Sequence, residues 1–364
     1  MQWPRSTLFV LTLVGLAVVV VACSGGGEHS GAASEGSTTA PRPSPSTTTS
    51  PTVTSTTTVS PSPGNLTVLP AVTPRSTTID ATLTTPDGRA RTYHVYVPST
   101  VPRGSSAGPA APLLVALHGG VGSGTQFERN SGFDGLAEAN RFIVVYPDGT
   151  GTGPSGTALR TWNGGACCGS AVRNNVNDVE FIRLLIQQLE SQYPIDRSRV
   201  FAAGHSNGGI LAYRLACELS DQIVAIGVQS TSLELDHCRP SQPVSLLHIH
   251  GTADHNIPIG GGRGTSGISG VSFQPPINGV QAIAAADGCA AAPVEATDPA
   301  NADVTTQTWQ SCGADTTVQF IKVAGASHAW MGHPGGAVAL GGAPYTKLDS
   351  SLTIWTFLAA HPRR

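Results

Sequence analysis

Residues 204–209 constrain this chain most, because they place a serine between glycines in the pattern Gly-x-Ser-x-Gly. An apolar, strand-like run at 199–203 precedes the pattern, and a helix-like run at 210–216 follows it. A serine at the tip of a sharp strand-to-helix turn is strained, and only small residues two positions away avoid the neighbouring backbone. The pattern therefore predicts a strand, a tight turn carrying Ser206, and a helix whose positive N-terminal end lies beside the serine hydroxyl.

Two later strand-like runs end in an acid and a base. The run at 244–250 is followed by Asp254, and the run at 318–323 by His328. A serine hydroxyl is a poor nucleophile until an imidazole accepts its proton, and a carboxylate fixes the tautomer of that imidazole. Open α/β sheets place their sites at the carboxyl ends of strands, and the order Ser, Asp, His is that of α/β-hydrolases. We therefore expect Ser206 to be the nucleophile, Asp254 the acid and His328 the general base.

Other titratable residues compete for these roles. Asp178 stands before an apolar run and is typical of a helix N-cap. His205 lies inside the turn, and we expect its side chain to point away from the nucleophile. His333 is the closest rival base, and its alternative interpretation is a surface-loop histidine.

A metal site is a further alternative. His248 and His250 share one face of a strand, and Asp254 and His255 follow them. Metallo-hydrolases use a similar His-x-His-x-Asp-His motif, but two extra residues separate the second histidine from the aspartate here. We therefore expect a structural histidine pair, no metal and no other cofactor.

The oxyanion that forms on an acyl substrate needs backbone N–H donors near the serine. Asn207 supplies one by its position directly after the nucleophile. The second donor is expected from a loop after an early strand, and the apolar run at 112–117 is followed by His118-Gly119-Gly120. We assign that donor to Gly120.

Several motifs carry a family resemblance. They are Leu-His-Gly at 117–119, Val-Val-Tyr-Pro-Asp at 144–148, Trp-Asn at 162–163, Cys-Cys-Gly at 167–169, Asn-Asp-Val-Glu-Phe-Ile at 177–182, His-Gly-Thr-Ala-Asp at 250–254 and Gly-Ala-Ser-His-Ala-Trp at 325–330. With them the chain resembles secreted esterases of the polyhydroxybutyrate depolymerase and feruloyl/acetylxylan esterase kind, from about residue 77 to about residue 361.

The resemblance implies an α/β-hydrolase fold, in which a mostly parallel central sheet has helices on both faces. It also implies that Ser206, Asp254 and His328 form the triad. The tryptophan at the mouth of the family's site matches Trp162, whose aromatic face would contact substrate. The family pattern pairs Cys289 with Cys312.

The N-terminal part of the chain predicts export. Arg5 and an apolar run at 8–21 precede Cys23, which is the pattern of a lipoprotein signal peptide at 1–22 with Cys23 as the lipidated residue. Residues 23–75 are rich in Ser, Thr and Pro and predict a disordered tether. Residues 76–364 then form one esterase domain, anchored to the outer face of the cytoplasmic membrane through Cys23 only.

Seven cysteines minus Cys23 leave six, and an even number in an exported protein suggests disulfides. Beside the pair that the resemblance implies, four remain with three possible pairings. One option joins Cys217 to Cys238 and Cys167 to Cys168.

Charge and loop composition complete the functional hypothesis. The net charge is −3, and the sequence has no basic stripe, so we expect no nucleic acid binding. The insertions at 148–176 and 259–270 lack the apolar spacing of a lid helix and predict polar, open loops. We expect a monomeric serine esterase of the cell envelope acting on short-acyl, aryl or polyester substrates. The alternatives are an acyltransferase with the same triad and a non-catalytic lipoprotein that binds polysaccharide or polyester.

Overall fold

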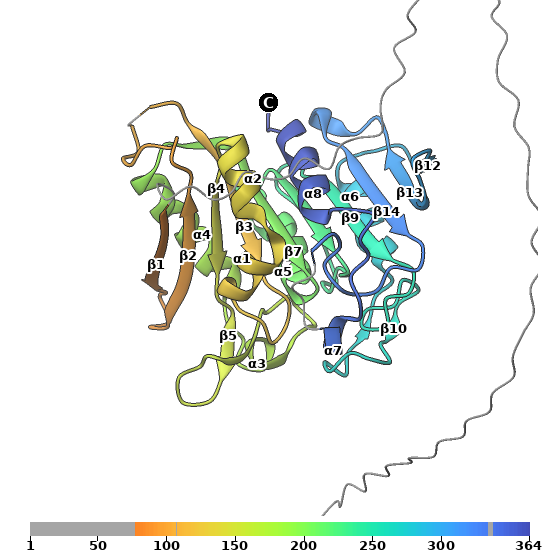
Figure 1. The fold of residues 1–364 in the computed structure, drawn as a ribbon, viewed down its shortest axis with the longest axis horizontal. Helices are drawn as coiled ribbons and strands as arrows, with labels where there is room; N and C mark the ends of the chain where they lie inside the picture. Colours follow the sequence, from red (N-terminus) through yellow and green to blue (C-terminus); the bar gives the residue numbers. More distant parts are fainter. Residues whose placement is uncertain (1–76, 107, 334–337) are drawn as a thin grey trace, which may run out of the picture. The chain divides into compact units, whose positions relative to one another are not determined.

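The computed structural model describes residues 77–106, 108–333 and 338–364. Within them, ten strands form one sheet in the order β1-β2-β4-β3-β7-β8-β9-β14-β13-β12 (Figure 1). The six central strands are parallel and comprise β4 (Ile143–Pro147), β3 (Ala111–Leu117), β7 (Ile195–His205), β8 (Ala225–Gln229), β9 (Ser245–Gly251) and β14 (Val318–Val323). Antiparallel strands flank them, β1 (Thr77–Thr84) and β2 (Ala90–Val97) at one edge, and β13 (Asn301–Trp309) and β12 (Val294–Asp298) at the other. The mostly parallel sheet predicted from the sequence is confirmed.

The first two strands form a hairpin at one edge of the sheet. Thr84 pairs with Ala90, so residues 85–89 connect the two strands. Gly88 has a φ of 78°, in the left-handed region that favours glycine. The Asp87 carboxylate caps the turn by accepting hydrogen bonds from the Thr85 hydroxyl (2.5 Å) and the Arg89 N–H (3.3 Å).

Helices cover both faces of the sheet (Figure 1). On one face lie α4 (Asp178–Gln192), α5 (Asn207–Glu218) and α6 (Pro276–Ala286), and on the other lie α1 (Gly124–Ser131), α2 (Phe133–Asn140) and α8 (Ser350–Ala360). Alternate side chains of β3 enter the two cores, with Leu113 and Val115 in the first and Leu114 and Ala116 in the second. Burial of both faces explains why the central strands are continuous apolar runs in the sequence.

The predicted cap of α4 is displaced by one residue. Asn177 is the N-cap, and its side-chain oxygen accepts from the Glu180 N–H at 3.1 Å. Asp178 is the first helical residue and is buried, with one carboxylate oxygen 2.7 Å from the Arg91 guanidinium and the other 2.8 Å from the Asn163 N–H. The N-cap prediction for Asp178 is therefore wrong, because the buried arginine binds this carboxylate and leaves the capping to its neighbour.

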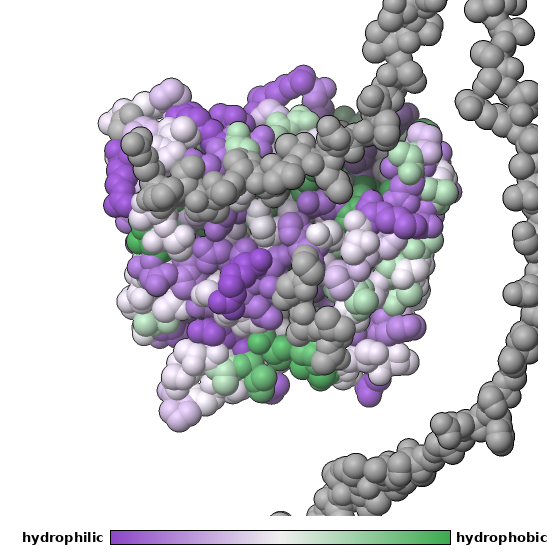
Figure 2. Space-filling view, viewed as in Figure 1, coloured by the Kyte–Doolittle hydropathy of each residue, from purple (hydrophilic) through white to green (hydrophobic). Residues whose placement is uncertain are grey.

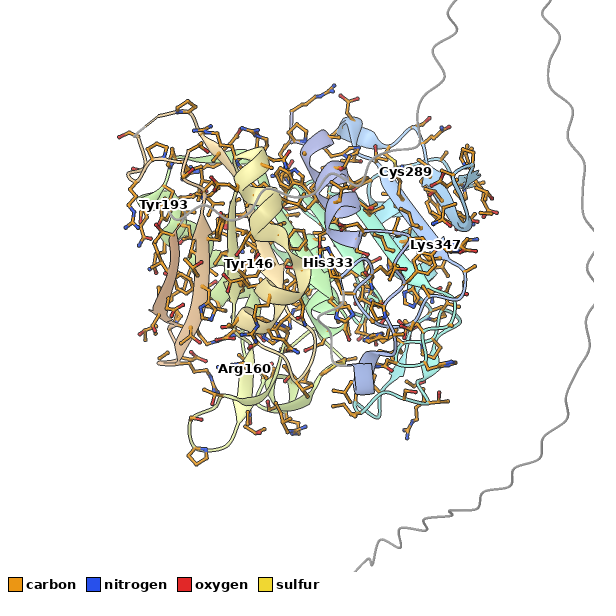
Figure 3. The ribbon with its side chains drawn as sticks, in the orientation of Figure 1. Tyr146, Arg160, Tyr193, Cys289, His333 and Lys347 are labelled. Carbon is orange, nitrogen blue, oxygen red and sulfur yellow. A yellow bond between two sulfur atoms is a disulfide. The ribbon has the colours of Figure 1, made fainter. Side chains whose placement is uncertain are left out.

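Three disulfides are present in the described residues. Cys289, just after α6, pairs with Cys312, just after β13 (Figure 3). The other four cysteines pair as Cys217–Cys238 and Cys167–Cys168, the option that the sequence leaves open. Disulfides of this kind are typical of proteins that fold outside the reducing cytosol, so the structure is consistent with export.

Short elements complete the fold. They are β5 (Thr150–Thr152), β6 (Ala158–Thr161), α3 (Gly169–Arg173), β10 (Gly262–Arg263), β11 (Ser272–Phe273), η1 (Gly313–Asp315) and α7 (Val338–Gly341). No helix in the described part of the chain is long and apolar enough to cross a bilayer. The predicted signal peptide, Cys23 and the predicted tether at 23–75 lie outside the described residues.

Candidate active site

Ser206 stands between the end of β7 and the start of α5. Its φ of 53° and ψ of −122° are strained for a residue with a side chain. Backbone contacts hold this conformation, because the Ser206 N–H donates to the Gln229 carbonyl (3.0 Å) and the Thr231 hydroxyl donates to the Ser206 carbonyl (2.9 Å). The serine is therefore fixed by its main chain before any substrate arrives.

The glycines of the turn are required by close backbone approach. A Cβ at Gly208 would collide with the carbonyl oxygens of Leu117 and His118, at the end of β3. A Cβ at Gly204 would collide with the backbone of Gly208 itself. The Gly-x-Ser-x-Gly pattern is thus required because the turn packs too closely, against β3 and against itself, to accept a Cβ at either glycine.

The structure brings the three predicted triad residues together. His328, on the loop after β14, has its Nε2 2.9 Å from the Ser206 Oγ. Its Nδ1 lies 2.8 Å and 3.0 Å from the two carboxylate oxygens of Asp254, on the loop after β9. With Nδ1–H donating to the carboxylate, Nε2 is free to accept the serine proton.

Asp254 is held as a carboxylate. Burial raises its pKa, but the hydrogen bond and charge of His328 outweigh burial and lower the pKa to about 2. Its Oδ1 also accepts from the N–H groups of Asn256 and Ile257, both at 2.9 Å. These two bonds fix the carboxylate so that Oδ2 faces the histidine.

The rival histidines have other partners. The His205 Nε2–H donates to the His328 carbonyl at 2.7 Å, and burial lowers the His205 pKa to about 3, so the ring is neutral. The His333 Nε2 lies 3.1 Å from a carboxylate oxygen of Asp349, the N-cap of α8 (Figure 3). Neither imidazole has a hydrogen bond to the Ser206 hydroxyl.

The loop after β3 carries the predicted second oxyanion donor. Gly120 and Asn207 line the same cleft as Ser206. His118 anchors this loop, since its Nε2 accepts from the Gly149 N–H (2.9 Å) and its Nδ1–H therefore donates to the Gly119 carbonyl (2.7 Å). Burial lowers the His118 pKa to about 4 and keeps the ring neutral. The Leu-His-Gly motif contains this histidine, but the sequence alone gives no sign of its anchoring role.

Trp162 does not offer an aromatic surface to substrate. Its side chain is 0% exposed and does not line the cleft. The indole N–H donates to the His118 carbonyl (2.9 Å), while the backbone N–H and carbonyl of Trp162 bind both ends of the Asn207 amide (2.7 and 3.0 Å). The substrate-contact prediction is therefore wrong. A buried indole N–H needs a hydrogen-bond acceptor. The His118 carbonyl supplies it beneath the loop, between the two segments that carry the predicted oxyanion donors.

The histidine pair on β9 is part of a buried hydrogen-bond chain. The His248 Nδ1 lies 2.8 Å from the Tyr213 hydroxyl, its Nε2 lies 3.1 Å from the His250 Nδ1, and the His250 Nε2–H donates to the Ile257 carbonyl at 2.9 Å. Across residues 77–106, 108–333 and 338–364, no group of three or more His, Cys, Asp and Glu side chains could hold a metal ion.

The cleft above Ser206 encloses about 550 Å³ and has an apolar rim. Leu159 is 61% exposed, Ile268 68% and Leu340 37%, and all three line the cleft. Apolar residues gather on the surface near α3 and α7, as Figure 2 shows. The expectation of polar loops is therefore wrong at the mouth of the site, because single aliphatic residues in glycine-rich loops leave no periodic signal in the sequence.

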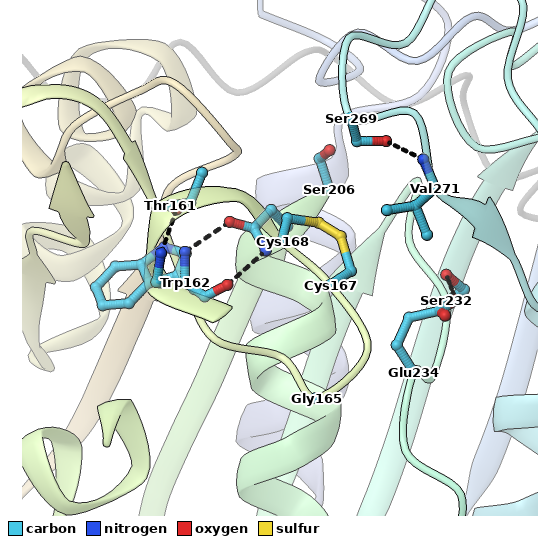
Figure 4. The surroundings of a disulfide bond; sticks show 12 residues. Thr161, Trp162, Gly165, Cys167, Cys168, Ser206, Ser232, Glu234, Ser269 and Val271 are labelled. Atoms are coloured by element: carbon cyan, nitrogen blue, oxygen red, sulfur yellow. Dashed lines mark hydrogen bonds between the residues drawn. A yellow bond between two sulfur atoms is a disulfide. The ribbon is translucent and has the colours of Figure 1, made fainter. Parts of the chain in front are cut away.

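The Cys167–Cys168 disulfide forms part of one wall. It packs in a buried cluster with Ile210, Ile257 and Phe273, and Cys168 itself lines the cleft. The disulfide lies beside the N-terminal part of α5, near Ser206 (Figure 4). An apolar wall therefore adjoins the nucleophile.

Known proteins resemble this chain in sequence and fold. The family "Esterase PHB depolymerase" matches residues 92–239. Feruloyl esterase B of Piromyces equi is 30% identical over 235 residues, which cover 63% of this chain and 41% of that protein. The putative esterase NocK of Nocardia uniformis subsp. tsuyamanensis is 29% identical over 294 residues, covering 74% of this chain and 80% of NocK.

Among solved structures, the acetyl xylan esterase from Aspergillus awamori superposes with a TM-score of 0.50 at 16% identity. The superposition covers 70% of this chain and 94% of that enzyme. At this identity the likeness concerns the fold.

Proposed function

We propose that the chain, which has an α/β-hydrolase fold and matches the family "Esterase PHB depolymerase" over residues 92–239, hydrolyses carboxylic esters through Ser206. The observation that carries the proposal is the continuous hydrogen-bonded chain from the Ser206 hydroxyl through His328 to the Asp254 carboxylate. The strained serine conformation at a helix N-terminus supports it.

The reaction follows from this arrangement. The Ser206 Oγ attacks the ester carbonyl carbon while the His328 Nε2 accepts the hydroxyl proton. The carbonyl oxygen becomes an oxyanion, and the N–H groups of Asn207 and Gly120 are the proposed donors to it. The alcohol leaves with the proton from His328, and a water molecule, deprotonated by the same imidazole, then hydrolyses the acyl-enzyme.

The decisive experiment compares wild type with Ser206→Ala on 4-nitrophenyl acetate. We expect kcat to fall at least about 10⁴-fold, since only binding and the oxyanion donors remain. A fluorophosphonate should label the wild type at Ser206 and leave the variant unlabelled. Ser191→Ala, at an exposed serine of α4, is the matched control and should keep wild-type activity. Equal kcat for wild type and Ser206→Ala would overturn the proposal.

The proposed substrates are short-acyl, aryl or polyester esters. The apolar rim of Leu159, Ile268 and Leu340 supports an apolar acyl or alcohol part. Some of the relatives are named as feruloyl or acetylxylan esterases, and on that ground feruloyl esters and acetylated xylan belong in the first substrate screen.

We further propose that the protein is lipid-anchored through Cys23 on the outer face of the cytoplasmic membrane. The apolar run that ends at Cys23 supports this location. Membrane fractions washed with high salt should retain wild type and lose Cys23→Ser, as measured by immunoblot. Retention of the variant would contradict the anchor.

A further inference from the structure

The cleft contains one residue of permanent charge. Among the described residues that line it, Arg173 is the single one of type Arg, Lys, Asp or Glu. The others are aliphatic, aromatic, hydroxyl, amide, cysteine and glycine residues, together with His118, His205 and His328. Burial lowers the pKa of His118 to about 4 and that of His205 to about 3, so both are neutral near pH 7. No described side chain that lines the cleft carries a permanent negative charge to match this cation.

The Arg173 guanidinium has no partner within the part of the chain that the structure describes. Its side chain is exposed and takes part in no hydrogen bond and no ion pair. Two other arginines near the site are used differently, since Arg91 is paired with Asp178 at 2.7 Å and Arg160 with Asp148 at 3.5 Å. Arg173 is thus available for a charge that arrives with a ligand.

The backbone beneath Arg173 is anchored. In α3, the Ala171 N–H donates to the Thr161 hydroxyl (3.2 Å), and the Ser170 hydroxyl donates to the Thr150 carbonyl (3.3 Å). The Cys167–Cys168 disulfide directly precedes this helix (Figure 4). The helix therefore keeps its place along the cleft, while the long arginine side chain can turn toward a ligand.

We propose that Arg173 binds a carboxylate carried by the substrate, so that the preferred substrates are esters with an apolar body and a free carboxylate. The inference rests on the proposed ester hydrolysis. A guanidinium binds a carboxylate with two parallel hydrogen bonds, and an apolar surrounding strengthens the attraction relative to water. An uncharged sugar ester or a simple alkyl ester would leave this cation without its counter-charge.

Two pairs of synthetic esters test the proposal. Mono(4-nitrophenyl) suberate and its methyl ester place a carboxylate, or a neutral group, on the acyl side. 4-Acetoxybenzoate and its methyl ester do the same on the alcohol side. The measured quantity is the ratio of kcat/KM for the acid to that for the methyl ester, each corrected for its uncatalysed hydrolysis rate.

The variants are Arg173→Gln, which removes the charge, and Arg173→Lys, which keeps the charge but not the planar fork. Arg239→Gln is the matched control, because Arg239 is also exposed, has no ion pair in the described residues, and does not line the cleft. In at least one ester pair we expect the ratio to fall about tenfold in Arg173→Gln and less in Arg173→Lys, as for a partly exposed charge-assisted pair. In Arg239→Gln the ratio should stay at the wild-type value.

The ratio should also fall in wild type as salt is raised, because the pair is partly exposed. The same ratio in wild type and Arg173→Gln for both ester pairs would overturn the carboxylate proposal alone. A wild-type protein that hydrolyses none of the four esters would instead overturn the proposed esterase function, and this inference with it.

Discussion

The floor of the cleft is formed by strand ends, whereas its rim is formed by side chains of loops, a short strand and short helices. On the floor, Ser206, Asp254 and His328 follow three parallel strands, β7, β9 and β14, and main-chain contacts fix the serine and the aspartate. On the rim, Leu159 and Ile268 are exposed and belong to glycine-rich segments. From this difference we infer that the proposed reaction depends on backbone geometry, while substrate choice depends on side chains that can change without disturbing the sheet.

The largest effect should come from the floor, at Asp254. Because Oδ1 is occupied by the N–H groups of Asn256 and Ile257, Asp254→Asn should place its NH₂ group where Oδ2 faces His328. That amide would force Nδ1 to accept and Nε2 to carry the proton, so the imidazole could not take the serine proton. We expect kcat to fall about 10³–10⁴-fold on every ester, acidic or neutral.

The pH dependence of stability gives a second test with the Asp254→Asn variant. The pKa of folded Asp254 is about 2, below the ordinary 3.8, so its stabilisation is present above pH 3.8 and is lost as the pH falls toward 2. The difference in free energy of unfolding between wild type and Asp254→Asn, from urea titrations, should therefore shrink between pH 4 and pH 2. A difference that stays constant over this range would contradict the lowered pKa.

An intermediate effect is expected at Trp162, which joins the floor to the loop of Gly120. Trp162→Phe keeps most of the packing but removes the hydrogen bond to the His118 carbonyl. We expect kcat to fall about 10–100-fold with a smaller change in KM, because a displaced oxyanion donor acts mainly in the transition state. Phe142→Leu, in the core on the opposite face of the sheet, controls for general loss of packing. A change in KM alone would mean that Trp162 acts on substrate binding.

The smallest effects should come from the rim, and they should depend on the substrate. Ile268→Ser should lower kcat/KM for a 4-nitrophenyl octanoate about fivefold and leave the acetate ester unchanged, because about 1 kcal/mol of apolar contact is lost only with the longer chain. Leu352→Ser, at an exposed leucine of α8 outside the cleft, is the control. Equal losses of kcat/KM on the octanoate and acetate esters would mean that Ile268 acts through the folding of its loop. That result would contradict the contrast between rim and floor.

The residues of the cleft floor can be predicted from the sequence because the patterns that mark them are local. The Gly-x-Ser-x-Gly turn, the apolar strands and the residues that follow them lie within a few positions of one another, and strand β14 occupies the predicted residues. The catalytic roles of Ser206, Asp254 and His328 remain predictions, although the structure places the three side chains within hydrogen-bond distance.

The sequence does not predict contacts that join distant segments of the chain. The indole of Trp162 bonds to a carbonyl 44 residues away, and Arg91 lies 87 residues from Asp178. No local pattern encodes such a partner, so the sequence predicts a substrate contact for the tryptophan and a helix cap for the aspartate, and both predictions are wrong. The apolar rim is not predicted from the sequence for a related reason. Its residues Leu159, Ile268 and Leu340 are scattered in the chain and line one cleft only in the folded protein.

The separation of 122 residues between Ser206 and His328 has a consequence for biosynthesis. A nascent chain that stops before β14 contains the nucleophile and the acid but has no base, and β9 lacks the parallel neighbour that completes its hydrogen bonds. If His328 is the base, as proposed, such a chain should not cleave an ester, however well its first strands have formed. On the proposed assignment of the triad, activity therefore requires the last segment of the chain, and recovered turnover during refolding should report the docking of β14 and of the His328 loop that follows it.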